Sequence, residues 1–388
     1  MSVVTPAALV ARAQRNCHLA DARHAAELTL CTYLLQMREF YRWERGLALG
    51  TPLQREAVGA WMAGREALWE ELADEDYAAL PLPGTAGGTA DPFDVDAVNA
   101  ALAPFSLLYG AGLVARNRPV FFVADLHGSG HREGLAVLQA GRELARTLLA
   151  PPAALGGGGA GPIVLRRESM ARWCWERTEA FAMRPRPGSA LHAMLVHYGL
   201  DRDFQAALPR WLDDQCETAV WHELGEYRLS QRWGTGWSEL REALGEPPGC
   251  ATGDGAEAGH EERHSGDAIR ADALVRTLRD QLADFAVTLP SLLDSPDPGP
   301  LHAWFAGYDG LREVSFPALT AGYAAWRAGD GGALLRAQQA HGLRHFEALA
   351  QGLLDGSTQC RATARTRLVH TMGGGVPPSI VCPWPGGS

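Results

Sequence analysis

One short segment, Trp221–Glu226, places a histidine and two carboxylates close together within a largely apolar stretch. His222 and Glu226 are four residues apart, so a helix would carry both on one face, with Glu223 on the neighbouring ridge. Helical metal sites use this spacing because two ligands can then reach one ion. Gly225 leaves the helix bare beside them, which would let a backbone or a ligand approach closely. The segment predicts a divalent-metal site with His222 and Glu226 as ligands and Glu223 as the general acid or base.

A second polar segment, His18–His24, supplies the other predicted ligands. Its two histidines flank Asp21 at steps of three residues, so on a helix Asp21 can share a face with either of them. His24 also begins an apolar stripe that continues into the following residues, and a buried histidine needs a polar partner. Helical folds build metal sites by facing such helices together. We therefore expect His24 and Asp21 to complete the site of His222.

Three interpretations of these residues stay open, and whether the chain is an enzyme stays open with them. A zincin protease is excluded, because that motif needs a second histidine where this chain has Glu226. In a non-enzymatic interaction or scaffold protein, the same polar groups would form a satisfied structural network. A third interpretation is a pocket for an anionic small molecule, held by arginines such as Arg38, Arg42 and Arg142.

The elements that must position these residues are predicted to be helices almost throughout. Residues 21–45 are expected to form one long central helix, and residues 100–115 a buried helix. Val120–Val123 and Ile163–Leu165 are the only runs that resemble strands. The predicted fold class is therefore mainly α, with two helical domains or lobes and at most a small β-hairpin.

Composition shifts give the expected domain boundaries. We expect an N-terminal helical domain over residues 1–150, a Gly/Pro linker over 151–162 and a C-terminal helical domain over 163–355. A polar, Gly-rich stretch at 246–266 predicts a mobile insertion, and residues 356–388 a disordered tail.

The composition excludes several function classes. All 35 basic residues are arginine, so lysine Schiff-base chemistry, a pyridoxal phosphate anchor and a P-loop lysine are impossible. The net charge of -10, without a basic cluster, argues against a nucleic-acid partner. A divalent metal is the one cofactor that the residues suggest, and a small-molecule ligand or protein partner stays unidentified.

Cysteine usage and hydropathy predict the compartment. The seven cysteines are scattered, odd in number and never form a CxxC pair, which argues against a disulfide framework. No signal peptide is visible, and the longest uncharged run falls short of the roughly 20 residues that cross a bilayer. We expect a cytoplasmic protein without a membrane partner.

Five segments carry a resemblance: His18–His24, Arg38–Glu44, Gly141–Arg146, Ala150–Pro152 and His222–Glu226. With them the chain resembles an uncharacterised family of bacterial proteins that contain a domain of unknown function, over most of its length up to about residue 350. That family has no assigned activity, so the resemblance implies a folded protein and nothing about its chemistry.

Overall fold

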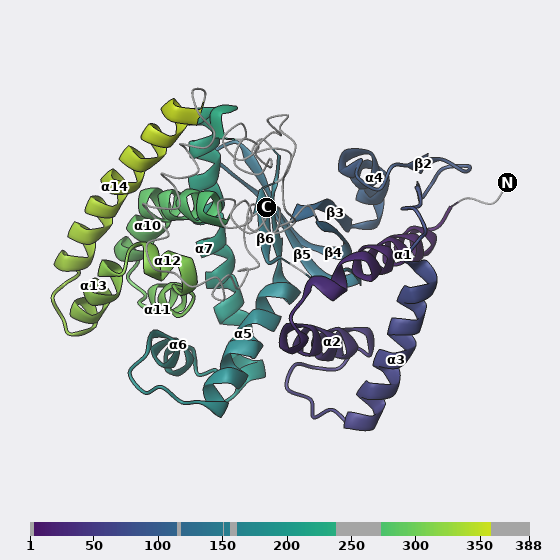
Figure 1. The fold of residues 1–388 in the computed structure, drawn as a ribbon, viewed down its shortest axis with the longest axis horizontal. Helices are drawn as coiled ribbons and strands as arrows, with labels where there is room; N and C mark the ends of the chain where they lie inside the picture. Colours follow the sequence, from purple (N-terminus) through teal and green to yellow (C-terminus); the bar gives the residue numbers. More distant parts are fainter. Residues whose placement is uncertain (1–3, 115–117, 150, 156–160, 238–272, 358–388) are drawn as a thin grey trace, which may run out of the picture. The chain divides into compact units, whose positions relative to one another are not determined.

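The computed structural model describes residues 4–114, 118–149, 151–155, 161–237 and 273–357, which form two compact units (Figure 1). Unit 1 is built from residues up to 154 together with 162–180, and unit 2 chiefly from residues 181 onward. The predicted insertion at 246–266 lies outside the described residues, and so does the predicted tail over 356–388 apart from residues 356 and 357, which belong to a described helix.

Unit 1 combines helices with a five-stranded mixed sheet. Its helices are α1 (Pro6–His24), α2 (Leu30–Glu44), α3 (Arg55–Leu72), α4 (Val95–Leu102) and α5 (Arg167–Met183), with short 3-10 turns η1 (Ala25–Glu27) and η2 (Ala103–Phe105). Its strands are β3 (Leu107–Val114), β4 (Arg118–Arg132), β5 (Leu135–Arg146), β6 (Ala153–Leu155) and β7 (Ile163–Arg166), in the order β3-β4-β5-β7-β6. A separate two-stranded sheet pairs β1 (Leu80–Pro81) with β2 (Thr89–Ala90).

The large sheet is mixed in its pairing. β4 pairs antiparallel with β3 and, through several bulges, with β5, whereas β5 and β7 run parallel. Successive residues of β4 point to opposite faces: Phe121 and Val123 pack in one apolar cluster with α1, and Phe122 packs in another. The parallel register sets Arg166, the last residue of β7, opposite Ala140, and β5 continues beyond that pair to Arg146.

The predicted mainly α fold is wrong, because this sheet occupies the centre of unit 1. Residues 107–114, expected within a buried helix, form β3, and Val120–Val123 lies inside the long strand β4. The turn between β4 and β5 has positive φ at Glu133 and Gly134, as a tight two-residue hairpin loop requires. The expected continuous helix over residues 21–45 is also wrong, since α1 ends at His24 and α2 starts at Leu30.

Unit 2 is helical in its described residues. Its elements are α6 (Ala190–Tyr198), α7 (Phe204–Trp233), helical residues 273–283, the π-helical segment η5 (Asp284–Thr288), α10 (Leu289–Asp294), α11 (Gly299–Ala306), α12 (Gly310–Ser315), α13 (Ala318–Arg327) and α14 (Ala333–Ser357). One apolar cluster, which includes Leu278, Phe285 and Phe346, forms its core. Across the described part of the chain, no helix combines the length and the apolar character that a membrane span needs.

Candidate metal centre in the helical unit

A close helix contact positions the candidate site in unit 2. A Cβ atom on Gly225 of α7 would lie 2.7 Å from the carbonyl oxygen and 2.8 Å from the Cα of Ala283. Only glycine permits this approach, which real Cβ atoms do not tolerate at such distances. The space expected beside Gly225 is thus occupied by another backbone, and that backbone brings acidic residues toward His222 and Glu226.

Three potential ligands converge at this contact. His222, Glu226 and Asp280 each offer one ligand atom, and these atoms all lie within 4.8 Å of one another. Metal–ligand bonds of about 2.0–2.2 Å for nitrogen and oxygen fit a set of this size with little movement. Asp280 was not predicted, although it and Asp284 repeat the i, i+4 spacing within an apolar segment, which was the available signal.

The orientation of His222 is fixed by a buried carboxylate. Its Nδ1 lies 2.9 Å from Oδ1 of Asp284, and its Nε2 lies 3.6 Å from Oε1 of Glu226. Asp284 is only 1% exposed and begins the π-helical segment, a feature that is frequent at functional sites. Arg312 donates to its Oδ2 and the Trp304 indole nitrogen lies 3.4 Å from its Oδ1. His222 therefore has one ring nitrogen held by Asp284 and the other facing the ligand set, as metal-binding histidines do.

The charges around the site give its carboxyl groups different pKa values. Burial would raise the pKa of Glu226, but Arg279, whose Nε donates to it at 3.1 Å, and His222 lower that pKa to about 2. Burial and the Glu226 charge raise the pKa of Glu223 to about 8 and that of Asp280 to about 7. Glu226 is thus ionised at neutral pH, while Glu223 holds a proton that it can release near neutrality.

The same charges act on the histidine. Burial alone would lower the pKa of His222, but the charge and hydrogen bond of Asp284, with a smaller contribution from Glu226, raise it well above its ordinary value. Without a cation, His222 therefore carries a proton and belongs to an ion-pair network with Asp284 and Glu226. A metal ion would have to displace that proton.

Two oxygen atoms of the site have no hydrogen-bond partner in the described part of the chain. They are Oε2 of Glu223 and Oδ1 of Asp280, and both are buried. A buried oxygen without a partner costs about 1–3 kcal/mol, so native proteins satisfy nearly all of them. These atoms mark where the network among the described residues is incomplete.

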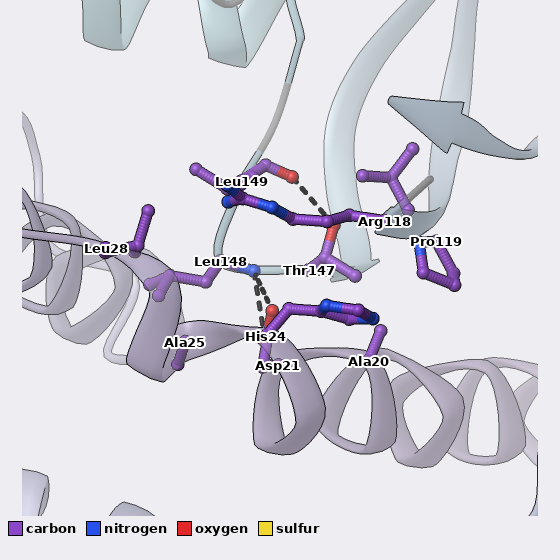
Figure 2. Close-up of a pocket in the computed structure, with 11 residues that line it drawn as sticks. Ala20, Asp21, His24, Ala25, Leu28, Arg118, Pro119, Thr147, Leu148 and Leu149 are labelled. Atoms are coloured by element: carbon purple, nitrogen blue, oxygen red, sulfur yellow. Dashed lines mark hydrogen bonds between the residues drawn. The ribbon is translucent and has the colours of Figure 1, made fainter. Parts of the chain in front are cut away.

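The other two predicted ligands, Asp21 and His24, lie in unit 1 and have partners there. Both carboxylate oxygens of Asp21 accept from the Leu148 N–H, at 2.9 and 3.0 Å, and Nδ1 of His24 lies 2.8 Å from Glu27. Figure 2 shows Asp21 and His24 on α1, beside a pocket that Arg118 also lines. The structure joins neither residue to the cluster of His222, and its ligand set uses Asp280 instead.

Replacing Asp21 by asparagine is expected to remove a pH dependence of stability. Burial raises the pKa of Asp21 to about 8, despite the Leu148 hydrogen bond, whereas an unfolded carboxyl titrates near 3.8. The folded state therefore holds the proton more tightly, and wild-type stability falls as the pH rises between these values. Asparagine does not titrate. As the pH rises, the free energy of unfolding of Asp21→Asn should therefore increase relative to that of the wild type, by up to about 1.4 kcal/mol per pH unit.

Urea denaturation between pH 4 and pH 8 measures this difference. The exposed Asp96 of α4 provides the control, since Asp96→Asn should follow the wild type across the range. A constant offset between Asp21→Asn and the wild type would contradict the prediction.

Comparisons with known proteins add a family and no activity. Residues 8–166 match the N-terminal domain of a family of unknown function (DUF6866), and residues 171–248 and 260–374 match its C-terminal domain. The match thus continues past the limit of about residue 350 expected from the sequence. No curated protein and no solved structure matches the chain.

Proposed function

Because the chain belongs to a family of unknown function (DUF6866), we propose its function from the site itself: unit 2 binds a divalent cation and performs metal-assisted acid–base chemistry. The ligands are His222, Glu226 and Asp280. One observation carries the proposal, namely that three potential ligand atoms from two helices lie within 4.8 Å of one another. The orientation of His222 by Asp284 supports it.

The donor set suits a borderline cation. One imidazole and two carboxylates bind Zn²⁺, Mn²⁺ or Fe²⁺, and such three-ligand sites leave positions for water or substrate. A bound cation would supply Lewis acidity and lower the pKa of a bound water. Glu223 is placed to exchange a proton, because it is buried beside Glu226 and its raised pKa lies near neutrality.

The rival function is a structural one, and a specific observation favours it. Arg279 donates to Glu226, and Arg312 donates to Asp284, so two of the carboxylates already have cationic partners. In a scaffold protein, this ion-pair network would hold α7 against residues 273–283 without any cation. The two functions differ in whether the protein binds a metal ion.

Metal binding is tested on the untagged full-length protein after removal of metals with a chelator. Titration calorimetry with Zn²⁺ and with Mn²⁺ is expected to show one site per chain. His222→Ala and Asp280→Asn should each weaken binding more than about 100-fold, since even outer partners of metal ligands contribute 10–100-fold. Glu223→Gln should retain the stoichiometry, because Glu223 is not a ligand in this proposal.

Two controls separate the site from the surface. His341 is an exposed histidine of the same unit and Asp294 an aspartate of α10 that pairs with Arg336. His341→Ala and Asp294→Asn should bind metal as the wild type does. Absence of binding in the wild type, or binding that His222→Ala and Asp280→Asn leave intact, would remove the metal proposal and favour the structural network.

A further inference from the structure

Three arginines gather in unit 1 near the carboxyl end of β7, where Glu143 of β5 pairs with two of them. Arg146 ends β5, Arg166 ends β7, and Arg172 lies in α5, which begins directly after β7. Their exposed fractions are 2%, 3% and 6%, so all three are more than nine-tenths buried. The carboxyl ends of parallel strands, followed by a helix N-terminus, are a common position for ligand binding in sheets with crossover helices.

Two carboxylates pair with this group, which we call the arginine cluster. The Nε of Arg166 donates to Oε1 of Glu143 at 2.7 Å, and an Nη of Arg146 lies 3.6 Å from Oε2 of Glu143. The Nε of Arg172 lies 3.6 Å from Oε1 of Glu176, beyond hydrogen-bond distance, and an Nη of Arg172 donates to the Leu148 carbonyl oxygen at 3.5 Å. Glu143 itself is 3% exposed, so it shares the burial of its partners.

Much of the hydrogen-bonding capacity of the arginine cluster is unused. Five buried guanidinium nitrogen atoms have no hydrogen-bond acceptor among the residues that the structure describes: Nε and one Nη of Arg146, both Nη of Arg166, and Nε of Arg172. Buried polar groups in native proteins are nearly always hydrogen-bonded, and each one left without a partner costs free energy. The arginine cluster therefore lacks hydrogen-bond acceptors for its N–H groups. A ligand with several oxygen atoms would supply them.

Aromatic rings hold two of these guanidinium groups by their faces. Arg166 lies 4.3 Å above the centre of the Phe122 ring, and Arg146 lies 5.6 and 5.4 Å from those of Phe40 and Trp43. Such contacts attract the guanidinium charge but supply no oxygen acceptor for its N–H groups. The rings thus stabilise the two cations and leave their need for acceptors unmet.

The cluster also carries excess positive charge. Glu143 is ionised, because Arg166 and Arg146 lower its pKa against the effect of burial. Burial raises the pKa of Glu168, next to Glu143, to about 7. Burial and the repulsion from Arg172 lower the pKa of Arg146 to about 10. Burial also raises the pKa of Glu176, the partner of Arg172. Three arginines therefore face one carboxylate with a lowered pKa, Glu143, and two with a raised pKa, Glu168 and Glu176.

We propose that the arginine cluster of Arg146, Arg166 and Arg172 binds a phosphate group, either free phosphate or the phosphate of a monoester. Phosphate oxygens accept several guanidinium N–H bonds at once, and the negative charge of phosphate offsets arginine charge that Glu143 alone does not compensate. A carboxylate ligand has two oxygens and one charge, and matches the donors and the charge less well. The proposal is independent of the metal site, which lies in the other unit.

The test measures ligand-dependent stability of the full-length protein by scanning calorimetry at constant ionic strength. Inorganic phosphate is expected to raise the melting temperature by several degrees, with a shift that grows with the logarithm of its concentration above the dissociation constant, as for a ligand of the folded state. Acetate and chloride should not raise it. A parallel titration with glycerol 3-phosphate separates free phosphate from a monoester, because the preferred ligand produces the same shift at a lower concentration.

Variants assign the effect to the cluster. Arg172→Gln should weaken phosphate binding at least tenfold in titration calorimetry, and Arg166→Gln should weaken it further. Arg142 lies on the same strand β5 but is 70% exposed in its side chain, so Arg142→Gln should bind as the wild type does. If Arg166→Gln does not fold, the wild type and Arg172→Gln decide the question. The proposal is overturned if phosphate does not raise the melting temperature, if acetate gives the same shift, or if Arg172→Gln retains the wild-type affinity.

Discussion

Replacement of Gly225 by alanine is expected to lower the free energy of unfolding by about 3 kcal/mol, at the upper end of overpacking effects. The added Cβ would lie 2.7 Å from the Ala283 carbonyl oxygen and 2.8 Å from its Cα. Both are backbone atoms, so no side-chain rotation relieves the contact, and α7 must move away from residues 273–283. Urea denaturation measures the loss, and hydrogen exchange of the α7 amides localises it.

The matched control is Gly352, which lies in the helix α14 of the same unit. A Cβ at Gly352 meets nothing within 4 Å, so alanine there should stabilise by about 0.5–1 kcal/mol through the reduced entropy of the unfolded chain. The opposite signs of the two substitutions identify the contact with Ala283 as the cause. A Gly225→Ala protein as stable as Gly352→Ala would show that the helices do not approach as closely as the structure has them.

Gly225 also sets the distance between the ligands that the two helices contribute to the candidate metal site. His222 and Glu226 lie on one helix, and Asp280 on the other, so separating the helices separates the ligands. A shift of about 1 Å is large against bonds of about 2.0–2.2 Å. Gly225→Ala should therefore lose cation affinity together with stability, whereas Gly352→Ala should keep both.

The errors of the fold prediction have identifiable physical causes. Residues 135–146 are rich in Leu, Ala, Gln, Glu and Arg, which favour helices, yet they form β5 between β4 and β7. Pairing on both edges outweighs intrinsic propensity, and such pairing is not visible locally. In β3 a signal was present: a Cβ at Gly110 would lie 2.1 Å from the Phe122 ring, so this glycine marks a close approach within a strand.

Only the part of the candidate site that lies on one helix was predictable from the sequence. The i, i+4 spacing of His222 and Glu226 and the bare surface at Gly225 follow from helix geometry, and they are adjacent in the structure. Which segment lies opposite depends on tertiary packing. His24 and Asp21 were expected there because of their residue types, but Asp280 and Asp284 occupy that position. The buried arginines were harder to identify, because Arg146 and Arg166 come together only through the parallel pairing of β5 and β7.

Replacement of Asp284 by asparagine is expected to cost about 3–5 kcal/mol of stability, as breaking one side of a buried ion pair does. Asp284 is the shared partner of the His222 imidazolium and the Arg312 guanidinium, so both charges would stay buried without it. The exposed pair of Asp294 and Arg336, at 2.9 Å, provides the contrast. Asp294→Asn should change the free energy of unfolding by less than about 1 kcal/mol, because water screens that pair.

The titration of His222 gives this substitution a second readout. A raised pKa means that the histidine contributes stability fully below pH 6.5, and that the contribution is lost as the pH rises through the folded-state value. Removing the Asp284 charge lowers that value, so in Asp284→Asn the loss should be smaller and should be complete at a lower pH. NMR of the His222 ring protons follows the shift directly. An unchanged pKa of His222 in the variant would mean that Asp284 does not hold the proton on the ring.

Asp284→Asn finally distinguishes the two functions of the site. If His222 binds a cation through Nε2, Asp284 is the group that positions its ring, and the variant should keep one site per chain with about 10–100-fold weaker affinity. If the cluster is only an ion-pair network, the wild type binds no cation and the substitution affects stability alone. A variant that binds metal as tightly as the wild type would contradict the role of Asp284 in either function, because both depend on its contact with His222.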